Sequence, residues 1–341
     1  MDDNYVDENY DVVVIGGGAA GLAGGVALAR SRRSVLVVDA GDPRNAPAGH
    51  VHNFLTRDGT PPAEIWAAGR GEVTRYGGRT ETGRVTALWR DGERFGVQVG
   101  GRTVAARRLL AATGLRDELP DVPGLAARWG IDVLHCAYCH GWEVSGQRIG
   151  ILATGPAGVH QALLFRQLSP HVTLLRHTGP APAAEQRAQL DARGIAVVDA
   201  AVEQIEAGAR GLTGVRLADG RRVALDAVVV APRLTARAEL LAPLGLRPGE
   251  VRVDGHLAGT RIETGPAGTT AVPGVCGPPA TSPTCRLRSS RPRRPGWPPG
   301  PRSTSTSSPR RPGPPPGGPS HPGQAVSPTG RAGSRRRAAG R

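Results

Sequence analysis

The stretch Asp11-Val-Val-Val-Ile-Gly-Gly-Gly-Ala-Ala-Gly21 decides the fold of the amino-terminal part of this chain. An apolar run leads into a glycine-rich turn, an alanine-rich stretch continues to about Arg30, and a second apolar run follows at Ser34–Asp39. In this order of strand, turn, helix and strand, a G-x-G-x-x-G motif indicates a dinucleotide-binding unit. An alanine- and glycine-rich turn without a ligand is the alternative interpretation.

Each position of the motif has a physical task in such a unit. Gly16 allows the tight turn, Gly18 lets the backbone approach a pyrophosphate, and Gly21 lets the helix pack closely on the strand. The helix N-terminus offers N–H groups and the positive end of its dipole to phosphates. Asp39 ends the second strand, where an acidic side chain is expected to bind ribose hydroxyls.

A second α/β unit is predicted further along the chain. Thr103–Thr113 is expected to form a strand that ends in Ala-Ala-Thr-Gly114, and proline and glycine then indicate a linker at Pro120–Gly124. The second unit begins with a strand, a turn and a helix that ends at about Leu168. Its predicted strands are Arg148–Ala153, Val172–Leu175, Ile195–Val198 and Ala227–Ala231.

The composition changes abruptly at Cys276. Residues 276–341 contain 13 Arg and 16 of the chain's 31 Pro but no Asp or Glu, so this segment carries a charge of +13. Residues 1–275 hold 30 Arg and 29 acidic residues, which leaves them close to neutral. Too few apolar residues remain in 276–341 to offset the entropy of ordering, so this tail is predicted to be disordered.

The sequence also bounds the compartment and the partners. No apolar run approaches the roughly 18 residues that a membrane span requires, and the acidic start at Met1–Glu8 is unlike a secretion signal. A cytoplasmic location without a membrane partner is therefore expected. In that compartment a C-x-x-C pair indicates redox chemistry or metal binding more often than a structural disulfide.

The segment Cys136-Ala-Tyr-Cys-His-Gly-Trp-Glu143 resembles the thioredoxin reductase-like, FAD-dependent pyridine nucleotide-disulfide oxidoreductases. It is most similar to the C-x-x-C-H-G branch, which includes thioredoxin reductase homologues and fungal-type dithiol oxidases. The resemblance runs from about Tyr10 to Val275. Four matches carry it in the right order, namely the G-x-G-x-x-G motif, Ala112-Thr-Gly114 with Pro123-Gly124, the C-x-x-C segment, and Val272-Pro-Gly-Val275.

The resemblance implies an α/β fold with two Rossmann-like, three-layer domains, the second inserted in the first. Residues 1–116 would be the first part of an FAD-binding domain, residues 117–243 an NAD(P)-binding-like domain with the C-x-x-C pair, and residues 244–275 the return segment. Relatives are usually homodimers. The implied FAD-binding residues are Gly16, Gly18, Gly21, Asp39, Thr113 and Gly114.

The resemblance also implies catalytic roles. Cys139 would face the flavin, Cys136 would exchange with the substrate disulfide, and His140 would stand where relatives carry a proton donor. Thiol–disulfide exchange needs a thiolate attacker and a protonated leaving thiol, and a histidine next to the pair suits both tasks. Zinc binding is the competing interpretation of C-x-x-C, but it needs two more ligands, and no metal is expected. His50 and His52 border the flavin in relatives, and a tuning role and no role are equally open.

The chain departs from the family at the nicotinamide-binding turn. Relatives have a glycine triplet where this sequence has Ala153, Thr154 and Gly155, and the Cβ of Ala153 is expected to crowd a pyrophosphate. Arg176-His177 stands in place of an arginine-rich cluster that would hold the 2′-phosphate of NADPH. NADPH, NADH and O₂ therefore stay open as electron partners. An FAD-dependent dithiol oxidase that uses O₂ is the alternative to a disulfide reductase.

The tail is the larger departure, because the Gly-Asp or Gly-Asn element of the family is missing. Codons back-translated from Pro278 and read from their third base give Ala-Gly-Asn-Val-Thr-Asp-Leu, as in the family. We therefore infer a frameshift near Cys276, which would leave Cys276 and Cys285 without a redox role. An arginine-rich arm that binds nucleic acid is the weaker alternative, and an inactive homologue is another. The expected partner is a thioredoxin-like protein or a small-molecule disulfide, with no specific nucleic acid.

Overall fold

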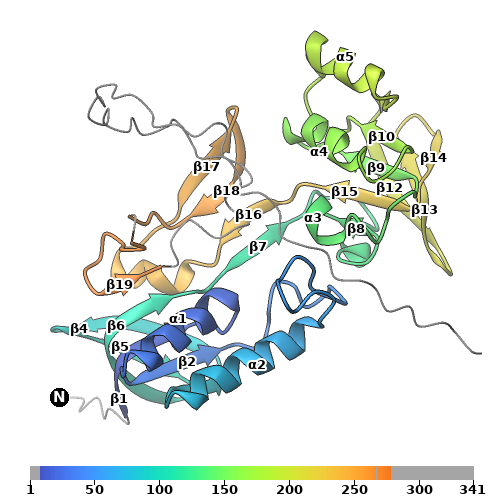
Figure 1. Cartoon of the computed structure of the whole chain (residues 1–341). Coiled ribbons are helices and arrows are strands. Elements are labelled where there is room, and N and C mark those ends of the chain that lie inside the picture. Colours follow the sequence, from blue (N-terminus) through green and yellow to red (C-terminus); the bar gives the residue numbers. More distant parts are fainter. Residues whose placement is uncertain (1–7, 266, 278–341) are drawn as a thin grey trace, which may run out of the picture. The chain divides into compact units, whose positions relative to one another are not determined.

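The computed structural model describes residues 8–265 and 267–277 of the chain (Figure 1). The prediction of a disordered tail therefore falls almost wholly outside the described residues, as do Cys285 and the proposed Gly-Asn element. Among the described residues, no helix has the length and apolar character needed to cross a membrane.

A seven-stranded sheet forms the first half of the fold (Figure 1). Its strand order is β3-β2-β1-β6-β5-β4, and β19 pairs with β6. Four neighbouring strands, β3, β2, β1 and β6, pair in parallel, and β19 also runs parallel to β6. The strands β4, β5 and β6 form an antiparallel meander. The strands are β1 (Glu8–Ile15), β2 (Val35–Asp39), β3 (Arg79–Thr82), β4 (Val85–Asp91), β5 (Arg94–Val99), β6 (Arg102–Ala111) and β19 (Val275–Cys276).

This sheet is covered on both faces, so its central strands read as continuous apolar runs. Because side chains alternate along a strand, Val12 and Val14 of β1 pack in one cluster and Val13 and Ile15 in another. The first cluster includes Leu22 of α1 (Ala19–Arg30) and Val73 of α2 (Pro62–Arg75). The second cluster receives Leu241 of the 3₁₀ helix η2 (Glu239–Leu244).

A five-stranded parallel sheet of order β11-β10-β9-β15-β8 forms the second half. One face packs on α4, and the other packs on an antiparallel meander of β12, β13 and β14. The resulting three layers agree with the predicted fold class. The elements are η1 (Ala126–Arg128), β8 (Val133–Leu134), α3 (Ala137–His140), β9 (Ile149–Leu152), α4 (Ala157–Phe165), β10 (Val172–Leu175), α5 (Ala184–Ala192), β11 (Ala196–Val198), β12 (Val202–Gly208), β13 (Gly211–Leu217), β14 (Arg222–Ala224) and β15 (Ala227–Val230).

The chain passes into and out of the second sheet through two strands that pair with each other. β7 (Leu115–Glu118) follows β6, β16 (Arg233–Ala236) follows β15, and the two run antiparallel with Leu115 opposite Ala236. A hairpin of β17 (Gly249–Val253) and β18 (His256–Arg261) extends this small sheet to four strands. The pair of connecting strands fixes where the chain enters the second unit.

The sequence predictions agree with these elements to within a few residues. The strand expected at Thr103–Thr113 is Arg102–Ala111, and β10 has the predicted bounds. The helix expected to reach Leu168 ends at Phe165, and turn-type bonds follow, including Gln167 N–H to Leu164 O at 3.2 Å. The α/β fold with two Rossmann-like units is thus confirmed.

Candidate active site

The glycine-rich turn after β1 needs glycine at two positions. Gly16 has φ of +110°, and a Cβ there would lie 2.2 Å from the carbonyl oxygen of Ala112. A Cβ on Gly21 would lie 1.8 Å from the carbonyl oxygen of Gly16, because α1 packs directly on the turn. Both glycines therefore shape the turn itself.

Gly18 has a different role, because space opens in front of it. A Cβ on Gly18 would meet no atom within 4 Å, and the residue is the N-cap of α1 with no side-chain hydrogen bond. The first N–H groups of the helix are thus left for a ligand, as a pyrophosphate requires. Asp39 lies at the end of β2, and its side chain comes within 2.6 Å of a Cβ built on Gly17. These residues fit the ADP half of a dinucleotide such as FAD.

Thr113 and Gly114 follow the strand that flanks this turn. Ala112 N–H donates to Ile15 O at 2.9 Å, which holds the start of the segment beside the glycine-rich turn. Gly114 has φ of +78° and an exposed position, and its carbonyl accepts a hydrogen bond from Arg237 N–H at 3.1 Å. The predicted FAD-binding residues of 16–21 and 113–114 are therefore brought to one edge of the sheet.

The turn after β9, which contains Ala153 and Gly155, differs in its packing from the glycine-rich turn after β1. Ala153 is 5% exposed, and a Cβ on Gly158 or Gly179 would lie 2.5 or 2.9 Å from its own Cβ. The Cβ of Ala153 therefore packs against Gly158 and Gly179, and the expectation that it crowds a pyrophosphate stays a prediction. Gly155 carries the open position here, with no atom within 4 Å of a built Cβ.

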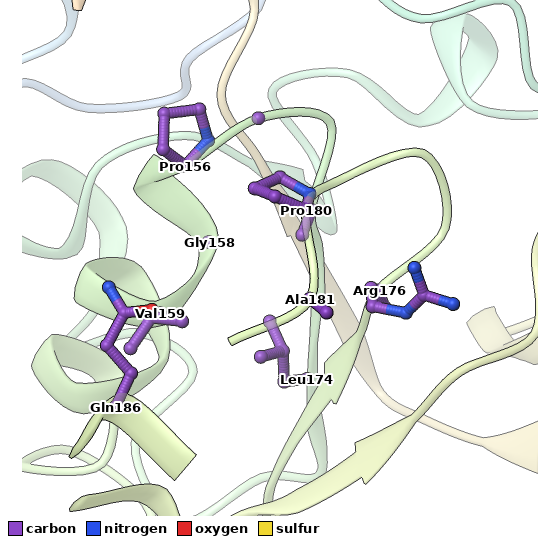
Figure 2. Close-up of a pocket in the computed structure, with 10 residues that line it drawn as sticks. Pro156, Gly158, Val159, Leu174, Arg176, Pro180, Ala181 and Gln186 are labelled. Atoms are coloured by element: carbon purple, nitrogen blue, oxygen red, sulfur yellow. The ribbon is translucent and has the colours of Figure 1, made fainter. Parts of the chain in front are cut away.

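A small pocket lies beside this second turn (Figure 2). Arg176 lines it, but its Nε donates to Asp199 Oδ1 at 2.8 Å, which ties the guanidinium to a neighbouring loop. His177 accepts a hydrogen bond from Val202 N–H at its Nδ1, and burial lowers its pKa, so this ring is neutral. The other lining residues are Ala153, Gly155, Pro156, Gly158, Val159, Leu174, Pro180, Ala181 and Gln186.

The two cysteines of the C-x-x-C segment lie at the start of the short helix α3. Cys136 is its N-cap residue, and Cys139 lies within it, so one helical turn brings the two sulfurs to 2.8 Å. Both thiols are free and partly buried. The Cys139 thiol donates to the Cys136 sulfur, and this bond is the largest cause that lowers the pKa of Cys136 to about 6. The same bond and burial raise the pKa of Cys139.

His140 follows the pair directly and is partly buried. Burial lowers its pKa, with Glu143 opposing this effect and His52 adding to it. Its Nε2 is buried and has no hydrogen-bond partner among the described residues. A neutral imidazole with one free nitrogen is equipped to accept and return a proton.

The loop between β2 and α2 adds contacts that the sequence did not assign. His52 Nε2 lies 3.1 Å from Glu143 Oε1, and Asn53 Nδ2 donates to the carbonyl of Tyr138 in α3. The ring of His50 lies 6.4 Å from that of His52. The sequence shows Glu143 at the end of the C-x-x-C-H-G-W-E segment. It does not show that His52 contacts Glu143, because this contact depends on how the loop folds.

No cluster of three or more histidine, cysteine or acidic side chains within 8–265 and 267–277 is arranged to hold a metal ion. Cys276, the third cysteine among the described residues, has a free and partly buried thiol. It lies on β19, in register with Leu110 of β6.

The fold and the site together define a class, the dinucleotide-binding α/β proteins with a cysteine pair at the start of a helix. The family described as "Pyridine nucleotide-disulphide oxidoreductase" matches residues 10–267. The chain belongs to this family and is therefore an oxidoreductase enzyme. Its thioredoxin reductase members are FAD flavoproteins that use NADPH.

Individual relatives agree with this membership. Thioredoxin reductase tcpT of Claviceps purpurea is 36% identical over 258 residues, which is 71% of this chain and 80% of that protein. The crystal structure of HlmI is 44% identical with a TM-score of 0.72, over 81% of this chain and 86% of that one. An oxidoreductase from Agrobacterium tumefaciens is 36% identical with a TM-score of 0.72, over 79% and 88%.

Proposed function

We propose that this enzyme transfers electrons between NAD(P)H and a substrate disulfide through Cys136 and Cys139. The observation that carries the proposal is the placement of two free, partly buried thiols at the start of α3, with their sulfurs 2.8 Å apart. The pKa of Cys136 is lowered to about 6, whereas that of Cys139 is raised. A pair in this state attacks a disulfide from Cys136 at neutral pH.

The exchange step balances within the chain's own residues. The Cys136 thiolate attacks the substrate disulfide, forms a mixed disulfide and releases one substrate thiolate. Cys139 gives its proton to His140 and attacks Cys136, which forms the Cys136–Cys139 disulfide and releases the second substrate thiolate. His140 returns its proton to one leaving sulfur, solvent supplies the other, and two electrons pass to the substrate.

When bound, FAD supplies the two-electron carrier that links the nicotinamide to the cysteine pair. Gly16, Gly18, Gly21 and Asp39 would hold its ADP half, with Thr113 and Gly114 beside them. Gly155 would lie at the turn that receives the nicotinamide dinucleotide. The open positions at Gly18 and Gly155 support this assignment.

We also propose the domain limits 1–116, 117–243 and 244–275. The larger sheet takes its strands from β1–β6 and from β19, whereas the five-stranded sheet takes all of its strands from within 117–243, which supports these limits. The substrate is a thioredoxin-like protein or a small-molecule disulfide, and a relative named thioredoxin reductase that is 36% identical supports the former. A cytoplasmic location, and a homodimer where the carboxyl-terminal part is intact, complete the proposal.

The proposal is tested by the visible spectrum of the full chain after FAD is added. Anaerobic NADPH should bleach the flavin band, and an added disulfide should restore it. Cys136→Ser should bleach but fail to recover, and Cys276→Ser should behave as wild type. A flavin that NADPH and NADH leave oxidised but a dithiol bleaches would refute the reductase and establish the dithiol oxidase.

A further inference from the structure

The turn after β9 repeats the backbone pattern of the turn after β1. Gly16 N–H donates to the carbonyl of Val38 at 2.8 Å, and Ala153 N–H donates to the carbonyl of Leu175 at 2.9 Å. In each case the residue that follows the first strand is bonded to the second strand of the unit. The two turns are therefore equivalent in backbone hydrogen bonding.

This equivalence places Arg176 where the first unit has Asp39. Asp39 directly follows Val38 at the end of β2, and Arg176 directly follows Leu175 at the end of β10. In dinucleotide-binding units an acidic side chain near this place binds ribose hydroxyls, whereas an arginine accommodates a 2′-phosphate. The second unit thus has the residue type that suits a 2′-phosphorylated nucleotide.

The pocket beside the second turn offers a single positive charge. Arg176 is the one charged side chain among the ten described residues that line it. His177 follows in the sequence but adds no charge, because burial lowers its pKa and its Nδ1 accepts a hydrogen bond from Val202 N–H. Recognition of a 2′-phosphate at this pocket therefore depends on Arg176.

Asp199 already engages this guanidinium. Arg176 Nε donates to Asp199 Oδ1 at 2.8 Å, and Arg176 Nη2 donates to the backbone carbonyl of Asp199 at 3.3 Å. The two residues follow paired strands, since Leu175 of β10 lies opposite Val198 of β11. In Figure 2 the guanidinium points away from Gln186, which lines the same pocket.

The carboxylate has two effects on an approaching phosphate. It occupies donors that a bidentate arginine–phosphate contact would use. It also places a negative charge next to any phosphate that the remaining donors bind. The side chain of Asp199 is 68% exposed, so water and salt moderate this repulsion without removing it.

We propose that Asp199 sets the nucleotide preference of this chain, because it holds Arg176 and weakens the binding of a 2′-phosphate there. This rests on the proposed use of NAD(P)H. Its consequence is that the wild-type chain discriminates little between NADPH and NADH, although an arginine stands at the position that selects for NADPH.

The test is calorimetric titration of the full chain with NADP⁺ and with NAD⁺ in a phosphate-free buffer. Asp199→Asn keeps a hydrogen-bond acceptor for Arg176 but removes the charge. It should tighten NADP⁺ binding by about three- to tenfold and NAD⁺ binding by less than about twofold. Adding Arg176→Gln to Asp199→Asn should abolish the gain. Asp219→Asn is the matched control, because it removes a carboxylate that binds another arginine, Arg221, outside the pocket.

Four results would overturn the proposal. They are an unchanged NADP⁺ affinity in Asp199→Asn, equal gains for both dinucleotides, a gain that persists in the double variant, and a wild-type chain that binds neither dinucleotide. The titrations require neither flavin reduction nor the cysteines. A chain that binds the dinucleotides as expected but does not pass electrons to a disulfide would therefore fail the proposed function alone.

Discussion

The sulfur of Cys139 lies 2.8 Å from the sulfur of Cys136 and donates the hydrogen bond between them. This bond stabilises a thiolate on Cys136 and a thiol on Cys139, since it is the largest cause of both pKa shifts. In the proposed reaction, Cys136 as the attacking sulfur therefore has the lower pKa and Cys139 as the resolving sulfur the higher one.

Removing the donor should make Cys136 less reactive near neutral pH. In Cys139→Ala the pKa of Cys136 should rise from about 6 toward its usual range, so its thiolate should form only at higher pH. We expect alkylation of Cys136 at pH 6.5 to slow by about tenfold, with little change at pH 9.5. Cys276→Ala is the matched control. A Cys136 profile that does not move in Cys139→Ala would contradict the assignment.

The second prediction concerns Glu143 and His140, the proposed proton-transfer residue. Glu143 raises the pKa of His140 against the effect of burial, so Glu143→Gln should lower the pKa of His140 further. The limb of the pH–rate profile that reports His140 is identified as the one that His140→Asn abolishes. In Glu143→Gln this limb should move to lower pH. Glu185→Gln, on α5, should leave that limb in place. If the limb stays at the same pH in Glu143→Gln, Glu143 does not influence the proton transfer.

The two glycines of the first turn should respond differently to the same substitution. A Cβ on Gly18 meets no atom within 4 Å, so Gly18→Ala should fold normally and lose FAD affinity by about tenfold or more. A Cβ on Gly21 would lie 1.8 Å from a carbonyl oxygen, so Gly21→Ala should lower the free energy of unfolding by about 2 kcal/mol or more. Flavin titration and urea unfolding measure these effects. Equal flavin affinity in wild type and Gly18→Ala would remove the phosphate role of Gly18.

Acid stability should depend on the Arg148–Asp226 ion pair. Arg148 binds both oxygens of Asp226 and also donates its N–H, which lowers the pKa of Asp226 to about 2. The stabilisation is complete above the unfolded pKa of about 4 and is lost as the pH falls through 2. Because both side chains are partly exposed, Asp226→Asn should cost about 0.5–1 kcal/mol at pH 7. A cost that stays constant from pH 7 to pH 2 would contradict this.

The order of strands and helices was predictable from local signals. The apolar run before Gly16 and the run at Val172–Leu175 are strands because both faces of their sheets are covered, and buried parallel strands lack polar alternation. The turn at Gly16 was predictable because a backbone with positive φ and a carbonyl within 2.2 Å of a Cβ admits only glycine.

The surroundings of the cysteine pair were less predictable. The pair was evident from its spacing, but the contact of His52 with Glu143 depends on how distant segments pack together. The surroundings of Ala153 were equally hard to predict, since its Cβ packs against Gly158 and Gly179, which lie on other segments. Side-chain direction in a turn is set by such neighbours and not by the turn's own sequence.

The most direct test of the central claim follows electrons into the two cysteines. The full chain is reconstituted with FAD, oxidised, treated anaerobically with NADPH or NADH, quenched in acid, alkylated and mapped by mass. Cys136 and Cys139 should be protected before the nicotinamide is added and alkylated after it, and this change should require FAD. A pair that stays protected with both nicotinamides, or that is alkylated from the start, would rule out electron transfer to the two cysteines.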